Sequence, residues 1–112
     1  MTMMEKPFID IGAIADIPVR GARVVKTPRA CIAVFRTAED TAFALEDRCP
    51  HLGGPLSRGA LRGRTLVCPW HAWMIDVPTG QVRGGRGAAV RTCPARVRDG
   101  FVEVGALAGM GA

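Results

Sequence analysis

The sequence contains no tyrosine, only two tryptophans and four phenylalanines, and only two histidines among its 112 residues. Nucleic-acid binding is disfavoured, because there is no run of basic residues and no aromatic platform for base stacking. No stretch of eighteen apolar residues occurs, so no transmembrane helix is expected. The first residues lack the basic and apolar regions of a secretory signal. We therefore expect a cytoplasmic chain with no membrane partner and no nucleic-acid partner.

The length and the turn signals predict one all-β domain. A chain of 112 residues is the size of a single domain, and no repeat or linker interrupts it. Short strand-like stretches alternate with turn signals. The expected strands are Phe8–Ile11, Gly21–Lys26, Cys31–Arg36, Thr41–Glu46, Ala60–Leu61, Leu66–Val67, Trp73–Asp76, Arg91–Val97 and Phe101–Val104. The last two strands should form a hairpin around Asp99-Gly100, a strong turn dipeptide.

Both histidines stand close to a cysteine, in Cys49-Pro50-His51 and in Cys68-Pro69-Trp70-His71. Each segment offers one thiolate and one imidazole at a spacing that lets both reach the same ion. A Cys-x-His segment with a Cys-x-x-His segment is the ligand set of a Rieske [2Fe–2S] centre, where two imidazoles replace two thiolates on one iron. The pattern therefore predicts one-electron transfer.

Other interpretations of these four residues remain open. A Cys₂His₂ set also holds structural zinc, although zinc fingers usually pair Cys with Cys and His with His. A structural zinc module is thus a remote alternative. A Cys–His catalytic pair is disfavoured, because the sequence supplies neither a third orienting residue nor an oxyanion site. A coincidence is disfavoured as well, because both histidines follow a Cys-Pro pair in stretches rich in Gly and Pro.

The runs Cys49–Ser57 and Cys68–Trp73 resemble the two cluster-binding loops of Rieske proteins. The resemblance covers about residues 8–104 and implies a single Rieske domain over 1–112, with a tail over 105–112. It implies a Rieske-type antiparallel β-sandwich or barrel whose cluster-binding part, about 47–76, carries the two loops. It also implies one [2Fe–2S] cluster per chain. The expected ligands are Cys49 and Cys68 on a buried iron and His51 and His71 on an outer iron.

Within this family, the run from Gly21 through Ser57 is most similar to the small subunit of assimilatory NAD(P)H-dependent nitrite reductase. That similarity implies a partner, a large subunit that carries flavin, siroheme and its own iron–sulfur cluster, and a role in nitrate assimilation. The chain would be an electron-transfer subunit of an oxidoreductase and not catalytic alone. The Cys-Pro-Trp-His segment also resembles Rieske ferredoxins and oxygenases. The alternative is therefore a free ferredoxin that serves a ring-hydroxylating oxygenase and its reductase.

Four residues are expected to surround the cluster. Leu52, Trp70 and Trp73 should pack around it and shield it from water, and Gly53 should permit a backbone conformation that side chains resist. High-potential Rieske proteins resemble one another in a serine two residues after the second histidine and in a nearby tyrosine. Here Trp73 takes the serine position and tyrosine is absent. We therefore expect a midpoint potential of about −150 mV, nearly independent of pH around neutrality.

The remaining cysteines and the third loop lie outside the ligand set. Cys31 and Cys93 fall in strand-like stretches, and we expect both to be small buried apolar side chains without a disulfide between them. The resemblance to Rieske domains also predicts a third loop near the cluster, which is proline-rich in many of them. The corresponding stretch here, residues 83–89, carries glycine and arginine instead.

All of the excess positive charge lies in the second half of the chain. Residues 1–57 carry seven basic and seven acidic side chains, whereas residues 58–112 carry eight arginines against three acidic residues. This distribution is typical either of a solvated basic face or of a surface that docks on an acidic partner.

Overall fold

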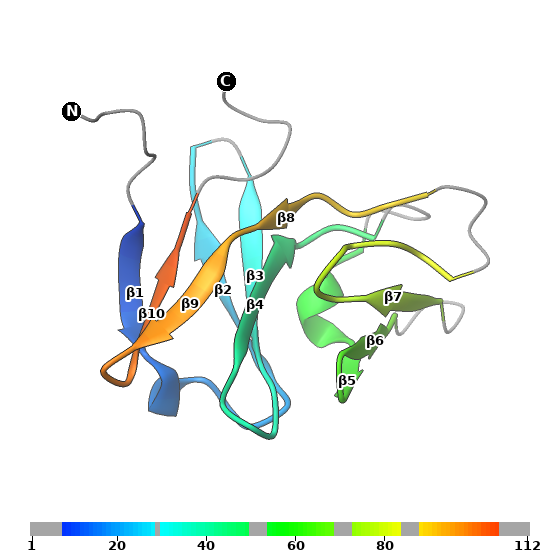
Figure 1. Cartoon of the computed structure of the whole chain (residues 1–112). Helices are drawn as coiled ribbons and strands as arrows, with labels where there is room; N and C mark the ends of the chain where they lie inside the picture. Colours follow the sequence, from blue (N-terminus) through cyan, green and yellow to red (C-terminus); the bar gives the residue numbers. More distant parts are fainter. Residues whose placement is uncertain (1–7, 29, 50–53, 69–72, 84–87, 106–112) are drawn as a thin grey trace.

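The computed structural model describes residues 8–28, 30–49, 54–68, 73–83 and 88–105, and these residues form three antiparallel sheets (Figure 1). The strands are β1 Ile9–Ala13, β2 Ala22–Lys26, β3 Cys31–Arg36, β4 Ala42–Glu46, β5 Ala60–Arg62, β6 Thr65–Val67, β7 Met74–Asp76, β8 Thr92–Cys93, β9 Ala95–Arg98 and β10 Phe101–Val104. Two short 3₁₀ turns, η1 Ile14–Asp16 and η2 Leu56–Arg58, complete the described elements. The all-β antiparallel prediction is confirmed.

The sheets follow one another across the molecule (Figure 1). Sheet A has the order β1-β10-β9, sheet B has the order β2-β3-β4-β8, and sheet C has the order β5-β6-β7. Sheet B lies in the middle, with sheet A on one side and sheet C on the other. Sheet C thus forms, with η2, a small subdomain beside a two-sheet sandwich.

The central strand β3 is buried on both faces of sheet B. Successive side chains of a strand point to opposite faces, and here they enter two different cores. Ile32 and Val34 pack in the core that sheets A and B share, whereas Ala33 and Phe35 pack in the core between sheets B and C. Burial of each large side chain contributes about 1.5–3 kcal/mol. This double burial explains the uninterrupted apolar run in the sequence.

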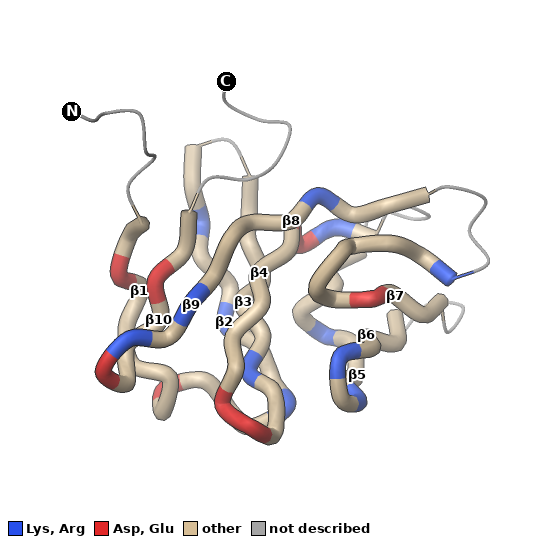
Figure 2. Tube along the Cα trace, in the orientation of Figure 1, with Lys and Arg blue, Asp and Glu red and all other residues tan. Residues whose placement is uncertain are grey.

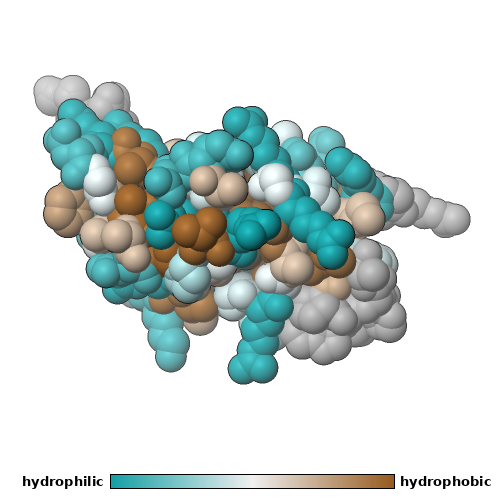
Figure 3. Space-filling view, turned by 90° about the horizontal axis from the view of Figure 1, so that it is seen from below, coloured by the Kyte–Doolittle hydropathy of each residue, from teal (hydrophilic) through white to brown (hydrophobic). Residues whose placement is uncertain are grey.

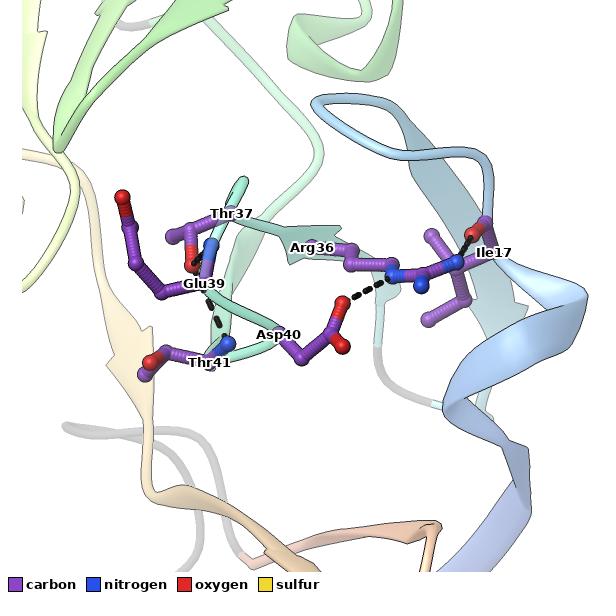
Figure 4. A network of polar contacts seen from close by, with 6 residues as sticks. All are labelled: Ile17, Arg36, Thr37, Glu39, Asp40 and Thr41. Carbon is purple, nitrogen blue, oxygen red and sulfur yellow. Dashed lines mark hydrogen bonds and ion pairs between the residues drawn. The ribbon is translucent and has the colours of Figure 1, made fainter.

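The β3–β4 hairpin is held by a polar network at the end remote from Cys49 (Figure 4). Buried Thr37 accepts the backbone N–H of Thr41 at its hydroxyl oxygen over 3.0 Å. The guanidinium of Arg36 donates to the Asp40 carboxylate and to the Ile17 carbonyl, both over 2.8 Å. The hairpin is therefore tied to the segment that follows η1.

The predicted strand Arg91–Val97 is wrong as a single strand. It is split at Pro94 into β8, which pairs with β4, and β9, which pairs with β10. Proline has no backbone N–H and cannot continue a ladder from within a strand. The chain therefore crosses from sheet B to sheet A at this residue. The predicted hairpin around Asp99-Gly100 is confirmed, and both turn residues have positive φ angles, 51° and 82°.

The two non-ligand cysteines have different surroundings. Cys93 is buried as expected, and burial, with a smaller contribution from the nearby Glu46 carboxylate, raises the pKa of its thiol to about 11. The expectation for Cys31 is wrong, because this residue is exposed. It is the first residue of β3 and pairs with Lys26 next to the turn that joins β2 to β3. No disulfide joins any of the four cysteines.

Candidate metal centre

The two cysteines predicted as ligands lie side by side in the core between sheets B and C. Cys49 follows β4, Cys68 follows β6, and their exposed fractions are 2% and 1%. Their Sγ atoms are 3.4 Å apart. A disulfide needs about 2.05 Å, whereas two thiolates bound to one tetrahedral metal at about 2.3 Å lie roughly 3.8 Å apart. The pair therefore fits two sulfur ligands of one metal ion.

Each cysteine also closes a loop through its backbone. The N–H of Cys49 donates to the carbonyl of Gly54 over 2.7 Å, and the N–H of Cys68 donates to the carbonyl of Trp73 over 2.8 Å. The two predicted ligand segments are thus closed at their ends by equivalent hydrogen bonds. Five of the predicted site residues lie outside the described residues: His51, Leu52, Gly53, Trp70 and His71.

The surroundings of the two sulfur atoms are apolar. The same core contains Phe35, Leu56, Leu66, Ile75 and Val77, all of them with side chains at most 1% exposed. Trp73 is partly buried and packs against this core, as the sequence predicts. Two neighbouring thiolates in such a dry place would repel each other strongly. A bound metal cation removes that repulsion, so the donor chemistry fits an iron–sulfur centre.

Asp47 is a residue of this region that the sequence did not reveal. Its carboxylate accepts the Ser57 backbone N–H over 2.6 Å and the Ser57 hydroxyl over 2.9 Å. The backbone N–H of Asp47 donates to the Cys31 carbonyl over 2.8 Å. The first loop is therefore closed twice, at Cys49 and again at Asp47. The available signal was an acidic residue at one end of the loop and a serine at the other.

The stretch that replaces the proline-rich loop returns to sheet C. Gln81 forms a bridge with Ala89, and Val90 donates its N–H to the Gly80 carbonyl over 2.7 Å. Gly80 has a φ angle of 79°, and a Cβ at this position would lie 2.1 Å from the Val90 carbonyl oxygen. Glycine thus allows two backbone segments to meet beside β7. Residues 84–87 lie outside the described residues.

Within the described part of the chain, no three His, Cys, Asp or Glu side chains come together as a metal site. Comparison with known proteins shows the family of the chain. Residues 8–94 match the Rieske [2Fe-2S] domain family. The chain belongs to this family. Its cofactor is therefore a [2Fe–2S] cluster, and its general role is one-electron transfer through that cluster. The prediction of the family and of its cofactor is confirmed, and the zinc alternative is not supported.

Curated relatives include both oxygenases and small ferredoxins. The chain is 51% identical over 45 residues to the 4beta-methylsterol monooxygenase of Methylococcus capsulatus. The matched residues make up 40% of this chain and 12% of that protein. It is 40% identical over 74 residues to the anthranilate 1,2-dioxygenase ferredoxin subunit of Burkholderia cepacia, 65% of this chain and 68% of that subunit. The chain thus spans about an eighth of the oxygenase and two thirds of the ferredoxin.

Solved structures show the same fold over almost the whole chain. One belongs to the complex of reduced oxygenase and oxidized ferredoxin in carbazole 1,9a-dioxygenase, with a TM-score of 0.77 and 27% identity over 90% of this chain and 94% of that chain. Another, from Mycobacterium tuberculosis, is described as an NADH-dependent nitrite reductase small subunit. Its TM-score is 0.83 and its identity 20%, and the match covers 93% of this chain and 98% of that chain. Relatives of this chain therefore work with oxygenases or reductases. No helix in the described residues is long and apolar enough to cross a membrane.

Proposed function

We propose that this Rieske protein is the small subunit of an NAD(P)H-dependent nitrite reductase. It would carry single electrons inside a cytoplasmic complex whose large subunit holds flavin and siroheme. The observation that carries the proposal is the similarity of the run Gly21–Ser57 to that subunit, a run that includes β2, β3, β4 and the first ligand loop. The fold shared with the nitrite reductase small subunit from Mycobacterium tuberculosis agrees with it.

We propose further that Cys49, His51, Cys68 and His71 hold the cluster. The adjacent buried Sγ atoms of the two cysteines support one iron held by both thiolates. The histidines, one in each closed loop of the sequence, would hold the other iron. When bound, the cluster takes up and releases one electron. The apolar side chains around the sulfur atoms exclude water from this end of the centre.

A second candidate function is a ferredoxin that donates electrons to a ring-hydroxylating oxygenase. The specific observation in its favour is the 40% identity to the anthranilate 1,2-dioxygenase ferredoxin subunit. A ferredoxin dissociates from its partners between electron-transfer steps, whereas a reductase subunit stays in its complex. The two candidates therefore differ in partner and in the lifetime of the complex, not in the cluster.

Reconstitution tests the first candidate against the second. The cluster-loaded chain would be added to a siroheme-containing large subunit purified without its small subunit, and nitrite-dependent NAD(P)H oxidation would be measured. The first candidate predicts restored activity and a complex that survives gel filtration. Failure here, together with stimulation of product formation by an anthranilate dioxygenase freed of its ferredoxin, would replace the first candidate with the second. The Cys31→Ser variant is the control, because this cysteine is exposed and lies outside the predicted ligand set.

A further inference from the structure

Three exposed arginines have either their backbone or their side chain next to Thr65 on sheet C, and we name Arg62, Arg64 and Arg83 the arginine patch. Arg62 is paired with Thr65 across the β5–β6 hairpin, and Arg64 precedes Thr65 in the chain. The Arg83 guanidinium donates to the Thr65 hydroxyl over 3.5 Å, which brings a third segment to the same place. Figure 2 shows basic residues at β5 and at the β5–β6 turn.

The charges of the patch are not neutralised by ion pairs within the described part of the chain. Elsewhere, ion pairs join Arg36 to Asp40, Arg91 to Glu46 and Arg96 to Glu103. No described carboxylate forms an ion pair with the three patch arginines. The nearest acidic residue by register is Asp76, which pairs with Thr65 across β6–β7. Its carboxylate accepts the Thr79 hydroxyl over 2.6 Å. The patch therefore keeps a net positive charge.

Arg64 is held in a way that leaves its hydrogen-bond donors available. Its guanidinium lies over the Phe43 ring, 5.5 Å from the ring centroid. A guanidinium stacked on an aromatic face can still present its N–H groups to a planar carboxylate. The stacking also reduces the side-chain entropy that docking would cost. The patch is thus suited to carboxylates of a protein surface.

The face seen in Figure 3 has no continuous apolar area that could dock a partner in place of the arginine patch. The apolar side chains there are divided into separate areas by hydrophilic ones. The large exposed apolar residues also come from different elements: Ile9, Val19, Val24, Met74 and Phe101. The face seen in Figure 3 therefore offers no continuous apolar surface to a partner.

The patch lies near the ligand cysteines but not on them. Arg64 and Cys68 flank the two ends of β6, so about four residues at roughly 3.3 Å each separate them by some 13 Å. The Debye length is about 8 Å at physiological ionic strength. The patch therefore acts on a protein that already touches sheet C, and its effect is to orient that protein next to the cluster-binding loops.

We propose that the arginine patch docks a redox partner through carboxylates on the surface of that partner protein. This inference rests on the proposed function as an electron carrier and holds for either candidate. When bound, the cluster would supply one electron to the oxidised centre of the docked partner, and no atom would be transferred. The patch makes no contact with the electron itself; it fixes the relative position of the two proteins.

The test uses the full, cluster-loaded chain and two haem proteins of opposite surface charge. Cytochrome b5 presents an acidic surface, and cytochrome c presents a basic one. Stopped-flow spectroscopy would follow oxidation of the reduced chain by each ferric protein at an ionic strength of about 0.01 M, where the Debye length is about 30 Å. We expect the Arg62→Glu/Arg64→Glu variant to react about tenfold more slowly with cytochrome b5 and no more slowly with cytochrome c.

A matched control separates the patch from the net charge. The Lys26→Glu/Arg98→Glu variant makes the same charge change at exposed residues of β2 and β9, outside every described ion pair. We expect its rate with cytochrome b5 to fall less than twofold. The Arg62→Lys/Arg64→Lys variant keeps the charge and should retain most of the rate. Titration of the oxidised chain with ferric cytochrome b5, followed by calorimetry, measures binding without electron transfer and should rank the variants identically.

Two outcomes would overturn the inference. Equal slowing of the patch variant and the control variant would show that net charge alone steers the partner. If the Arg62→Lys/Arg64→Lys variant also reacted much more slowly with cytochrome b5, the positive charge of the patch would not be the cause of docking. The proposed function fails differently: a purified chain that takes up no electron contradicts the function itself, whereas an active carrier with equal variants contradicts only the patch.

Discussion

At the scale of single residues, Asp47 illustrates how a side chain that is no metal ligand can hold a metal-binding loop. Its two carboxylate oxygens accept both polar hydrogens of Ser57, at 2.6 and 2.9 Å. A hydrogen bond to a charged acceptor contributes about 1.5–3 kcal/mol. An amide offers only one acceptor oxygen and no charge, so it cannot make both bonds equally well.

We expect Asp47→Asn to lower the free energy of unfolding by about 1–2 kcal/mol and Asp47→Ala by about 2–3 kcal/mol. Bleaching of the cluster absorbance in urea is the measurement, because the loop holds a proposed ligand. Asp16→Asn is the control, since Asp16 is exposed on η1 and makes no described side-chain bond. A stability of both Asp47 variants equal to that of the control would contradict the role of this carboxylate.

The proposed histidine ligands would set the potential of the cluster. His51→Cys replaces a neutral imidazole by a thiolate and adds one negative charge. From a starting value of about −150 mV, we expect the midpoint potential to move towards the roughly −400 mV of four-thiolate clusters, or the cluster to be lost. Potentiometric titration followed by absorbance measures this shift. A native midpoint well above zero, or an unchanged potential in the variant, contradicts the expectation.

At the scale of elements, much of the fold could be predicted from local patterns. The β2–β3–β4 meander follows from apolar runs separated by turn residues, and the β9–β10 hairpin follows from Asp99-Gly100. The division at Pro94 depends on which sheet each half joins, which is a tertiary property. The exposure of Cys31 depends on its place beside the turn of the β2–β3 hairpin. The meeting of Cys49 and Cys68 was predictable because their spacing in the sequence is typical of coordination chemistry rather than of packing.

At Gly80, the segment after β7 comes close to the segment before β8, and a substitution there tests how much this contact stabilises the fold. We expect Gly80→Ala to destabilise the protein by about 2–3 kcal/mol, because it combines a positive φ with a clash against the Val90 carbonyl. Gly63 has a similar φ of 61°, but a Cβ at that position would meet no atom within 4 Å, so Gly63→Ala should cost only about 1 kcal/mol. Urea unfolding followed by circular dichroism compares the two variants. Equal losses would show that the close approach at Val90 is unimportant.

Cys93 makes the fold sensitive to alkaline pH. Its thiol has a pKa raised from 9.0 to about 11 in the folded state, so the unfolded chain loses this proton first as the pH rises. Stability from this group is full below pH 9 and falls between pH 9 and 11, by up to roughly 2–3 kcal/mol. The difference in unfolding free energy between the native chain and Cys93→Ala should shrink over this interval. For the control Cys31→Ser, which alters an exposed thiol, the unfolding free energy should change with pH in the same way as that of the native chain. A difference in unfolding free energy between the native chain and Cys93→Ala that stays constant with pH would contradict the expectation.

At the scale of the whole molecule, the central sheet separates two tasks. One face completes the sandwich with sheet A, and the other face packs against the subdomain that carries the cysteine pair. The ligand loops can therefore be held firmly by buried strands while the flank of sheet C remains available to a partner. The arginine excess of the second half is visible in the sequence, but only the fold shows that Arg62 and Arg83 both lie beside Thr65.

The most direct test is the composition and ligation of the centre in the native chain. Iron and acid-labile sulfide should each be present at about two per chain. Pulsed EPR of the reduced protein labelled with ¹⁵N-histidine should show two coordinated nitrogen nuclei, and His51→Cys and His71→Cys should each remove one. A folded protein without sulfide, or a cluster whose spectrum shows no histidine nitrogen, would contradict the assignment of Cys49, His51, Cys68 and His71 as its ligands.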